Sequence, residues 1–522
     1  MSAAAPSWTR RHAPGLCIAA MTIVCAAMLA LPGRTVTAAF TNDVLIFLDG
    51  AHRIASGQLP NRDFHTALGP LVFFIPAAGY LLTGNLGAAM PVGMAVLLLA
   101  VMPALIAILN SRLHPAIALA LGGFLLLILA APINLGSPVS LLSFAMFYNR
   151  IGWVALSLLL VMYLRPRERG VTGEVADAMA AALLLLLQFY TKATYGLVSL
   201  GFILFMLTDA RQRRWAAASL LLTLVAAALI EIGWGGTRQH VEDLMAAAQV
   251  SGGRDLASLV RSGLNNLADL AVFAIAAGVA LWRTGSLRDL LFYGFCVTAG
   301  LLILNQNAHG WGIITLYSGT AVATELLVRL QAGRDRGAAA GRPSLADGLP
   351  LLLAFLLLPP IVHHGAVLAR HAVLAAADAG TSLGLPKLRD LRIPDPADSP
   401  DFMTRYHESI ESGGKLLLSL SPTPERVVVL DFVNPFSAGL GLRPPAGDSS
   451  WLHWGRNIDA ITHPAPDVMF ADAKFVMIPK VGINSLPLQQ LYGPFISRTF
   501  QLVQETDAWI VYEKRQPRET MR

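Results

Sequence analysis

The chain has 522 residues, of which 55% are hydrophobic and 14% charged, and its formal net charge is +6. Soluble domains carry about 25% charged residues, so this composition excludes a soluble globular protein and indicates an integral membrane protein. The positive charge does not indicate nucleic-acid binding, because the arginines lie in short clusters between apolar runs and form no single basic face.

Twelve apolar runs are candidates to cross a bilayer. They cover residues 16–32, 68–83, 88–109, 115–132, 150–164, 176–190, 194–208, 215–232, 267–282, 287–304, 310–330 and 349–369. Several are shorter than the ~20 residues that a spanning helix needs, so tilted or re-entrant segments are expected. The sequence therefore predicts a mostly α-helical, polytopic bundle of about 11–13 spans. We expect the first run to be a retained signal-anchor helix rather than a cleaved signal peptide.

The arginine clusters give the orientation, because positively charged loops stay in the cytoplasm. Counted from these clusters, the first loop (33–67), the break at 190–195, the loop 234–266 and everything after about residue 370 lie on the outer face. Counts from the two ends of the chain differ by one crossing between residues 68 and 164. One of the four runs in that stretch is therefore not a full span, or two are merged.

The first external loop holds a polar, carboxylate-bearing segment, residues 41–71. If this segment is helical, Asp43, Phe47 and Ala51 share one face, and Asp49 lies off it. Asp43 has two interpretations of equal weight. It is either a general base for an acceptor at the membrane surface or part of a helix N-cap with its neighbours.

Four further polar residues of this loop have both structural and functional interpretations. Asp49 precedes a glycine and is expected mainly to cap or turn the chain. Arg62 and Asp63 form a loop-stabilising pair or contact substrate. His65 belongs to the same cluster and is a candidate to orient a donor or an acceptor.

Lys192 lies between two apolar runs, at membrane depth, where an unpaired lysine is expensive. Either it extends to the interface or it binds a phosphate as a point charge, and the second interpretation is favoured. Tyr195, close to it in sequence, offers a hydroxyl donor. His309, in a polar turn of a later loop, is a weaker candidate for binding a phosphate or a sugar.

No histidine or cysteine pattern has metal-ligand spacing, so no metal site and no cofactor are predicted, although a divalent metal is not excluded. The three cysteines all lie in apolar runs. The composition changes at about residue 385. We therefore divide the chain into a transmembrane domain (1–370) with an amphipathic external loop (234–266), a linker (371–400), and an extracytoplasmic α/β domain (401–522). Strands are predicted at 426–431, 473–478 and 508–513, and helices at 405–420 and 485–492.

The loop motifs D-x-x-x-F-x-x-x-A, G-Q-x-P-x-R-D-F and G-P-L resemble the first external loop of the GT-C superfamily of membrane glycosyltransferases. The resemblance extends to bacterial mannosyl-, galacturonosyl- and aminoarabinosyltransferases, which use polyprenyl-phosphate sugars. It implies that Asp43 is catalytic and that Lys192 contacts the donor phosphate. The chain differs from the usual pattern in having Phe47 for a tyrosine and Gly69-Pro70 for a Pro-Pro pair.

The resemblance implies transfer of a sugar from a polyprenyl-phosphate donor to a lipid, polysaccharide or protein acceptor at the outer face of the inner (plasma) membrane. The implied partners are the lipid bilayer, the lipid-linked donor and a glycan or glycolipid acceptor, with no nucleic acid. Two alternatives remain. One is a non-catalytic factor of envelope-glycan assembly; the other is a transporter, which the absence of visible inverted repeats disfavours.

Overall fold

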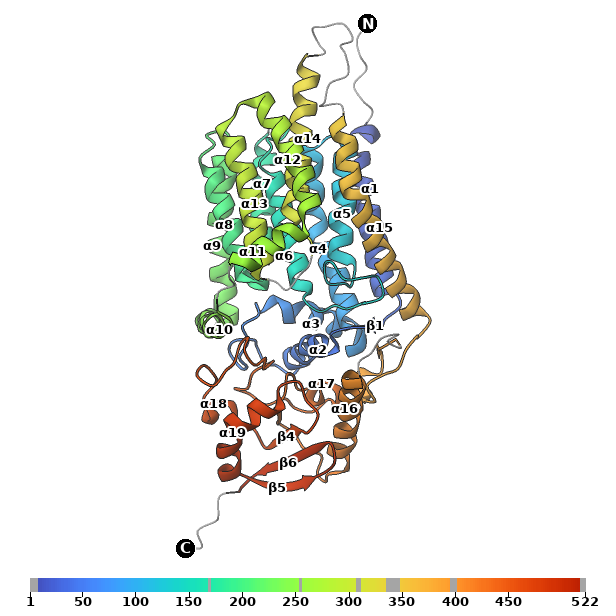
Figure 1. Ribbon diagram of the computed structural model, residues 1–522, viewed down its shortest axis with the longest axis vertical. Coiled ribbons are helices and arrows are strands. Elements are labelled where there is room, and N and C mark those ends of the chain that lie inside the picture. Colours follow the sequence, from blue (N-terminus) through green and yellow to red (C-terminus); the bar gives the residue numbers. More distant parts are fainter. Residues whose placement is uncertain are drawn as a thin grey trace.

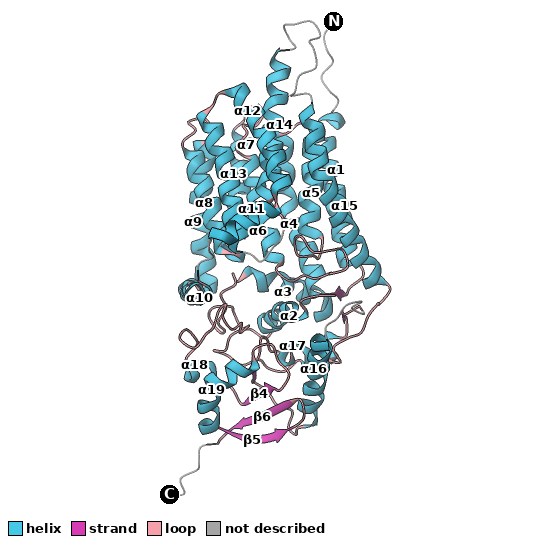
Figure 2. Cartoon of the chain, in the orientation of Figure 1, coloured by secondary structure: helices cyan, strands magenta, loops and turns pink. Residues whose placement is uncertain are grey.

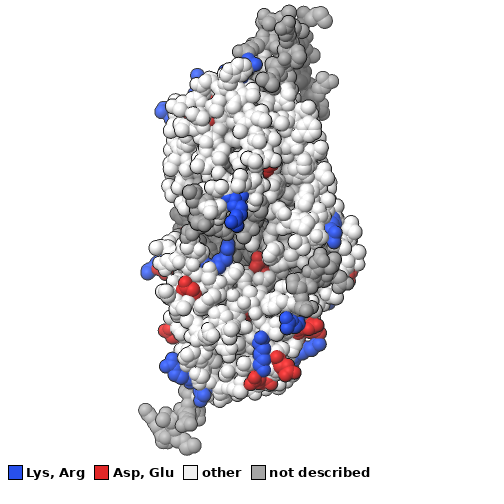
Figure 3. All heavy atoms as spheres, in the orientation of Figure 1, with Lys and Arg blue, Asp and Glu red and all other residues white. Residues whose placement is uncertain are grey.

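The computed structural model describes residues 8–167, 170–252, 256–306, 311–334, 348–394 and 401–516. A bundle of long helices occupies most of its length, and the C-terminal α/β domain covers one end (Figure 1). Strands are concentrated in that domain (Figure 2). The face drawn in Figure 3 has few charged side chains over the bundle, and more of them over the C-terminal domain.

All twelve predicted apolar runs are helical. The helices are α1 (Trp8–Ala30), α3 (Leu71–Thr83), α4 (Ala89–Arg112), α5 (Pro115–Ala130), α6 (Phe147–Val161), α7 (Val171–Thr191), α8 (Ala193–Leu207), α9 (Arg213–Trp234), α12 (Leu267–Thr284), α13 (Leu287–Gln306), α14 (Ile314–Arg334) and α15 (Leu349–Ala376). Among the described residues, seven helical segments are long and apolar enough to cross a membrane, and four more are apolar but shorter. The chain is a polytopic membrane protein of predominantly helical structure, as predicted.

A helix α3 that does not cross the membrane would reconcile the two crossing counts. Its 13 residues extend about 20 Å at 1.5 Å per residue, which is less than the ~30 Å hydrocarbon core. It packs against α4 and α2 (Thr41–Ala55), at the end of the bundle nearest the C-terminal domain (Figure 1). When α3 is removed from the twelve candidates, eleven crossings remain and the counts from both ends of the chain agree.

Ion pairs with buried acidic partners join several parts of the chain at the opposite end of the bundle. They are Arg112–Asp177, Arg165–Asp209, Arg288–Asp209, Arg167–Glu325 and Arg329–Glu325. Arg165 and Arg167 lie between α6 and α7, Arg288 is in the first turn of α13, and Arg112 and Arg329 belong to α4 and α14. The structure therefore places two of the arginine clusters predicted to share a side at one end. The assignment of that end to the cytoplasm stays a prediction.

The loop predicted as amphipathic contains α10 (Thr237–Ser251) and α11 (Leu256–Asn265). Helix α10 is seen almost end-on in Figure 1, so it runs across the direction of the long helices. It lies between the bundle and the C-terminal domain, at the level where an interfacial helix is expected.

The C-terminal domain is built on a four-stranded sheet of order β3-β4-β6-β5. The strands are β3 (Val427–Val429), β4 (Phe475–Pro479), β5 (Phe500–Glu505) and β6 (Trp509–Lys514), and the helices are α16 (Asp401–Ser419), α17 (Phe436–Leu440), α18 (Pro466–Met469) and α19 (Ser485–Thr499). The three predicted strands correspond to β3, β4 and β6. Strand β5 was missed because it is an edge strand whose residues are mostly exposed and show no apolar alternation.

A short parallel pairing ties the first external loop to the linker before this domain. Strand β1 (Thr35–Val36) pairs with β2 (Leu391–Arg392). Asp390 also pairs with Arg34 at 3.3 Å. Two 3-10 turns lie nearby, η1 (Leu86–Ala88) and η3 (Pro386–Leu388). Helix α15 continues six residues beyond the expected boundary at 370, and residues 395–400 of the predicted linker lie outside the described part of the chain.

Candidate active site

Asp43 lies in the first turn of α2, and the N-cap position belongs to Phe40, which has a left-handed backbone and makes no side-chain cap. An acidic residue in the first turn interacts favourably with the helix dipole. Asp43 is therefore not the N-cap residue, and its structural role in α2 is this interaction with the helix dipole. The residue as a whole is partly buried.

The surroundings of Asp43 favour proton transfer near neutral pH. Burial raises the pKa of Asp43 to about 6, and the Arg456 guanidinium opposes this increase. A general base works best when its pKa lies near the operating pH. Arg456 comes from the C-terminal domain, so that domain contributes a charge to the surroundings of the predicted base.

Lys192 forms the extended break between α7 and α8. Its Nζ donates a hydrogen bond to Asn149 Oδ1 at 3.1 Å and lies 5.6 Å from the centre of the Tyr148 ring. Asp43 interacts electrostatically with the same tyrosine, and Phe47 packs on it at 6.4 Å. Tyr148 therefore interacts with both the predicted base and the predicted phosphate-binding cation.

Gly69 explains why the first loop comes so close to the Lys192 break. Its amide donates to the carbonyl oxygen of Thr191 at 3.2 Å. A Cβ atom at this position would lie 2.2 Å from the carbonyl oxygen of Tyr190, which is too close for any side chain. The glycine of the G-P-L motif thus permits the backbone contact that joins the two halves of the site.

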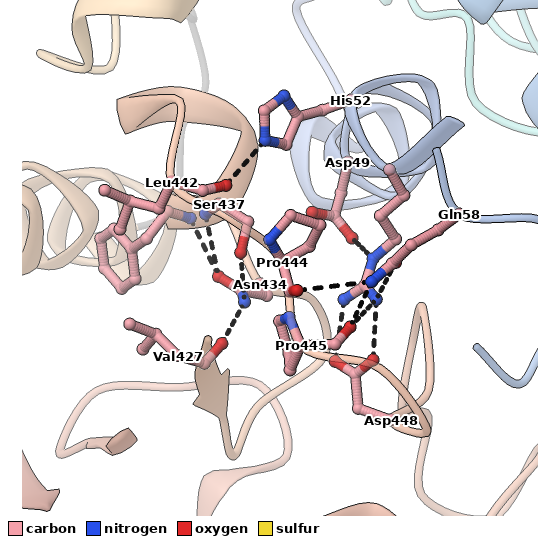
Figure 4. A network of polar contacts seen from close by, with 12 residues as sticks. Asp49, His52, Gln58, Val427, Asn434, Ser437, Leu442, Pro444, Pro445 and Asp448 are labelled. Atoms are coloured by element: carbon pink, nitrogen blue, oxygen red, sulfur yellow. Dashed lines mark hydrogen bonds and ion pairs between the residues drawn. The ribbon is translucent and has the colours of Figure 1, made fainter. Parts of the chain in front are cut away.

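Asp49 lies away from this site, in the buried network of Figure 4. Its carboxylate accepts a 2.6 Å hydrogen bond from Arg53 Nε. The Arg53 guanidinium also donates two bonds, of 2.7 and 2.8 Å, to Asp448 of the C-terminal domain. Other hydrogen bonds across the same junction join Gln58 to Pro444 and Pro445, and His52 to Leu442. In this structure Asp49 fixes the C-terminal domain on α2.

Arg62 and Asp63 are arranged as the loop-stabilising interpretation expects. Asp63 Oδ2 accepts from the Leu59 amide at 2.7 Å, and it pairs with the half-exposed Arg62 at 3.2 Å. Both side chains are occupied within their own loop. A role in substrate binding for either one stays a prediction.

His65 connects the first loop to α10. Its Nδ1 donates to Asp243 at 3.0 Å, and this hydrogen bond raises the pKa of His65. Burial alone would raise the pKa of Asp243, but hydrogen bonds from His65 and Gln239 hold it below its usual value. Asp243 also accepts from the Asn61 amide group. His65 therefore helps to dock α10 on the loop that carries the candidate site.

Tyr195 and His309 are the last two predicted site residues. Tyr195 is fully buried and packs edge-on against Trp153, with ring centres 5.5 Å apart. It lies inside the bundle, and its contact with substrate stays a prediction. His309 lies outside the described residues.

Four polar or charged residues were not found from the sequence: Tyr148, Asn149 and Arg150, which follow one another in α6, and Arg456, whose charge acts on Asp43. The first three occupy the first turn of α6, and Arg150 was counted there as the start of an apolar run. Arg150 is 1% exposed, and its guanidinium nitrogens have no hydrogen-bond partner in the described part of the chain. A lone arginine at the beginning of an apolar run was the available signal, since such a charge is expensive in a membrane.

Within the described residues, no group of three His, Cys, Asp or Glu side chains is arranged to hold a metal ion. Independence from metal stays a prediction.

The chain matches no family model and no curated protein. It is similar to the crystal structure of ArnT from Cupriavidus metallidurans bound to undecaprenyl phosphate, with 13% identity over 97% of this chain and 98% of that chain and a TM-score of 0.46. It is also similar to the apo state of the same enzyme, with 13% identity over 95% of this chain and 97% of that chain and a TM-score of 0.45.

Proposed function

We propose that this protein is a membrane glycosyltransferase. It moves a sugar from a polyprenyl-phosphate donor to a lipid, polysaccharide or protein acceptor at the outer face of the inner (plasma) membrane. The observation that carries the proposal is that Tyr148 interacts with both groups: Lys192 Nζ lies 5.6 Å from the centre of its ring, and Asp43 acts on it electrostatically. One supplies a proton acceptor with a pKa near neutrality. The other supplies a cation at the membrane edge.

The reaction needs these two groups. Asp43 accepts the proton of the acceptor hydroxyl or amine, and the freed electron pair attacks the anomeric carbon of the donor sugar. The bond from that carbon to the phosphate oxygen breaks, and polyprenyl phosphate leaves with the bonding electrons. Lys192, held by Asn149, stabilises the negative charge that develops on the departing phosphate.

A genetic comparison tests the proposal. Membrane glycolipids and surface polysaccharides are analysed by mass spectrometry in cells with and without the gene. We expect cells without it to lack one sugar and to accumulate the corresponding lipid-linked donor. Unchanged glycans in both lipids and polysaccharides would contradict the proposal.

Variants separate a transferase from an assembly factor. Asp43→Asn keeps the size of the side chain and removes proton acceptance, so we expect turnover to fall about 100-fold or more. Lys192→Met should weaken donor binding and slow phosphate departure together. The matched controls are Asp467→Asn and Lys415→Met, whose side chains are exposed in the C-terminal domain. Full complementation by Asp43→Asn would favour the assembly factor.

The outer location of the site is part of the proposal and has its own test. Single cysteines are introduced at the exposed positions Arg238 and Ser421, and at Thr172 on the arginine-rich end. A membrane-impermeant thiol reagent applied to intact spheroplasts should label the first two and not the third. Labelling of Thr172→Cys alone would reverse the orientation.

A further inference from the structure

A cavity of about 510 Å³ lies between α12, α14, α15 and the turn at Gly136–Ser137. None of the Asp43, Tyr148 and Lys192 side chains lines it. Phe355 of α15 lines the cavity and is 66% exposed on the outer surface of the bundle. Because the outer surface of a transmembrane helix faces lipid, this cavity opens to the bilayer.

The polar edge of the cavity is formed by two neighbouring histidines with defined hydrogen bonds. His363 Nε2 forms a hydrogen bond of 3.1 Å with the carbonyl oxygen of Ser137. His364 Nδ1 bonds the carbonyl oxygen of Pro360 at 2.8 Å. A carbonyl can only accept, so each of these two nitrogens carries the proton. A neutral imidazole has one donor and one acceptor nitrogen, so in a neutral ring the acceptor is Nδ1 for His363 and Nε2 for His364.

His364 has one ring nitrogen without a hydrogen-bond partner among the described residues. Its side chain is 1% exposed, and its Nε2 has no hydrogen-bond partner in the described part of the chain. Leaving a buried acceptor without a donor destabilises the protein. Arg150 acts on His364 electrostatically, but its guanidinium makes no hydrogen bond to the described residues.

A third acceptor faces the same cavity. Asp269 of α12 receives a 3.0 Å hydrogen bond from the Tyr317 hydroxyl, and both residues line the cavity with Trp311. Much of the remaining wall is apolar, with Val272 and Leu356 among its residues. The cavity thus combines an apolar wall open to lipid with a polar edge where His364 Nε2 has no donor in the described part of the chain.

We propose that this cavity binds a membrane lipid whose headgroup donates hydrogen bonds, through hydroxyl or ammonium groups, to His364 and its neighbours. A cavity of this volume is within the range of small-molecule sites. The lipid chain lies along Val272, Leu356 and Phe355, and the headgroup supplies the donor that His364 Nε2 lacks. This site is independent of the proposed sugar transfer.

The test measures lipid binding and uses no transferase assay. The protein is delipidated in lauryldimethylamine oxide, a detergent without hydroxyl groups, and its thermal unfolding is recorded with three phospholipids. Phosphatidylethanolamine offers ammonium donors, phosphatidylglycerol offers hydroxyl donors, and phosphatidylcholine offers neither. We expect the first or the second to raise Tm by several degrees and to remain bound in native mass spectrometry, and phosphatidylcholine to do neither. The phospholipid that raises Tm identifies whether the donor is an ammonium or a hydroxyl group.

Variants connect the response to the cavity. His364→Phe should abolish the lipid-induced shift in Tm, whereas His364→Gln, which keeps an acceptor, should retain part of it. Val362→Phe is the control, because residue 362 lies on the same helix and is 62% exposed. If His364→Phe does not fold, Val272→Phe fills the cavity from another helix and should have the same effect. Equal stabilisation by phosphatidylcholine, or an unchanged shift in the cavity variants, would overturn the proposal.

Discussion

Replacing Arg53 with methionine tests how the C-terminal domain is held over the candidate site. Arg53 is fully buried and contacts two carboxylates, with side-chain exposures of 1% for Asp49 and 3% for Asp448. Methionine preserves much of the length of the side chain but leaves both carboxylates without their cation. Breaking a buried pair by removing one partner costs about 3–5 kcal/mol. We expect a loss of unfolding free energy of this size.

The control variant is Arg62→Met in the same loop. Arg62 also pairs with an aspartate, but its side chain is 48% exposed, and such surface pairs contribute about 0–1 kcal/mol. The free energy of unfolding is measured by denaturant titration in mixed micelles, and limited proteolysis reports whether the C-terminal domain has separated from α2. Equal stability of the two variants would refute the assigned role of the buried network.

A triple variant separates the effect of uncompensated charge on stability from the effect of altered packing. Replacing Arg53, Asp49 and Asp448 together with apolar residues of similar volume removes every buried charge of the network. Such replacements are often neutral or stabilising, so the triple variant should recover most of the stability lost in Arg53→Met. If it is less stable than the single variant, packing rather than uncompensated charge explains the loss.

The remaining predictions concern pH, a buried charge and a close backbone contact. Since the base must be deprotonated, kcat/KM should fall as pH decreases through the Asp43 pKa of about 6, and a flat acid limb would argue against this base. The pKa of His65 is raised, so its pair with Asp243 stabilises the fold fully below the ordinary histidine pKa. This contribution is lost as pH rises through the raised pKa. The backbone amide hydrogens of residues 59–67 should then exchange faster with solvent. Arg150→Met removes a buried charge without a described partner and should raise Tm of the ligand-free protein, whereas a lower Tm would show that the charge is compensated. Gly69→Ala places a Cβ 2.2 Å from a carbonyl oxygen, and it should reduce both Tm and activity more than Gly173→Ala, which meets no atom within 4 Å.

The sequence by itself determined the membrane class, the helical bundle and the C-terminal domain with three of its four strands. Long apolar runs have few alternatives in a bilayer, because every backbone polar group must be satisfied within a helix. It also singled out Asp43 and Lys192, since charged groups near a membrane are expensive and seldom placed without a partner or a task. These inferences need only local composition and periodicity.

Tertiary structure decided which charged residues meet. The sequence favoured Asp43 over Asp49 as a functional carboxylate, but only the structure shows that Asp49 pairs with Arg53 and that Asp43 interacts with Tyr148 and Arg456. Arg456 lies more than 400 positions from Asp43, and no local pattern connects them. The packing of α3 against α2 and α4 is likewise visible only in the folded chain. Pairing over such distances is a property of the folded chain, because side-chain direction and helix packing, and not spacing in the sequence, bring these groups together.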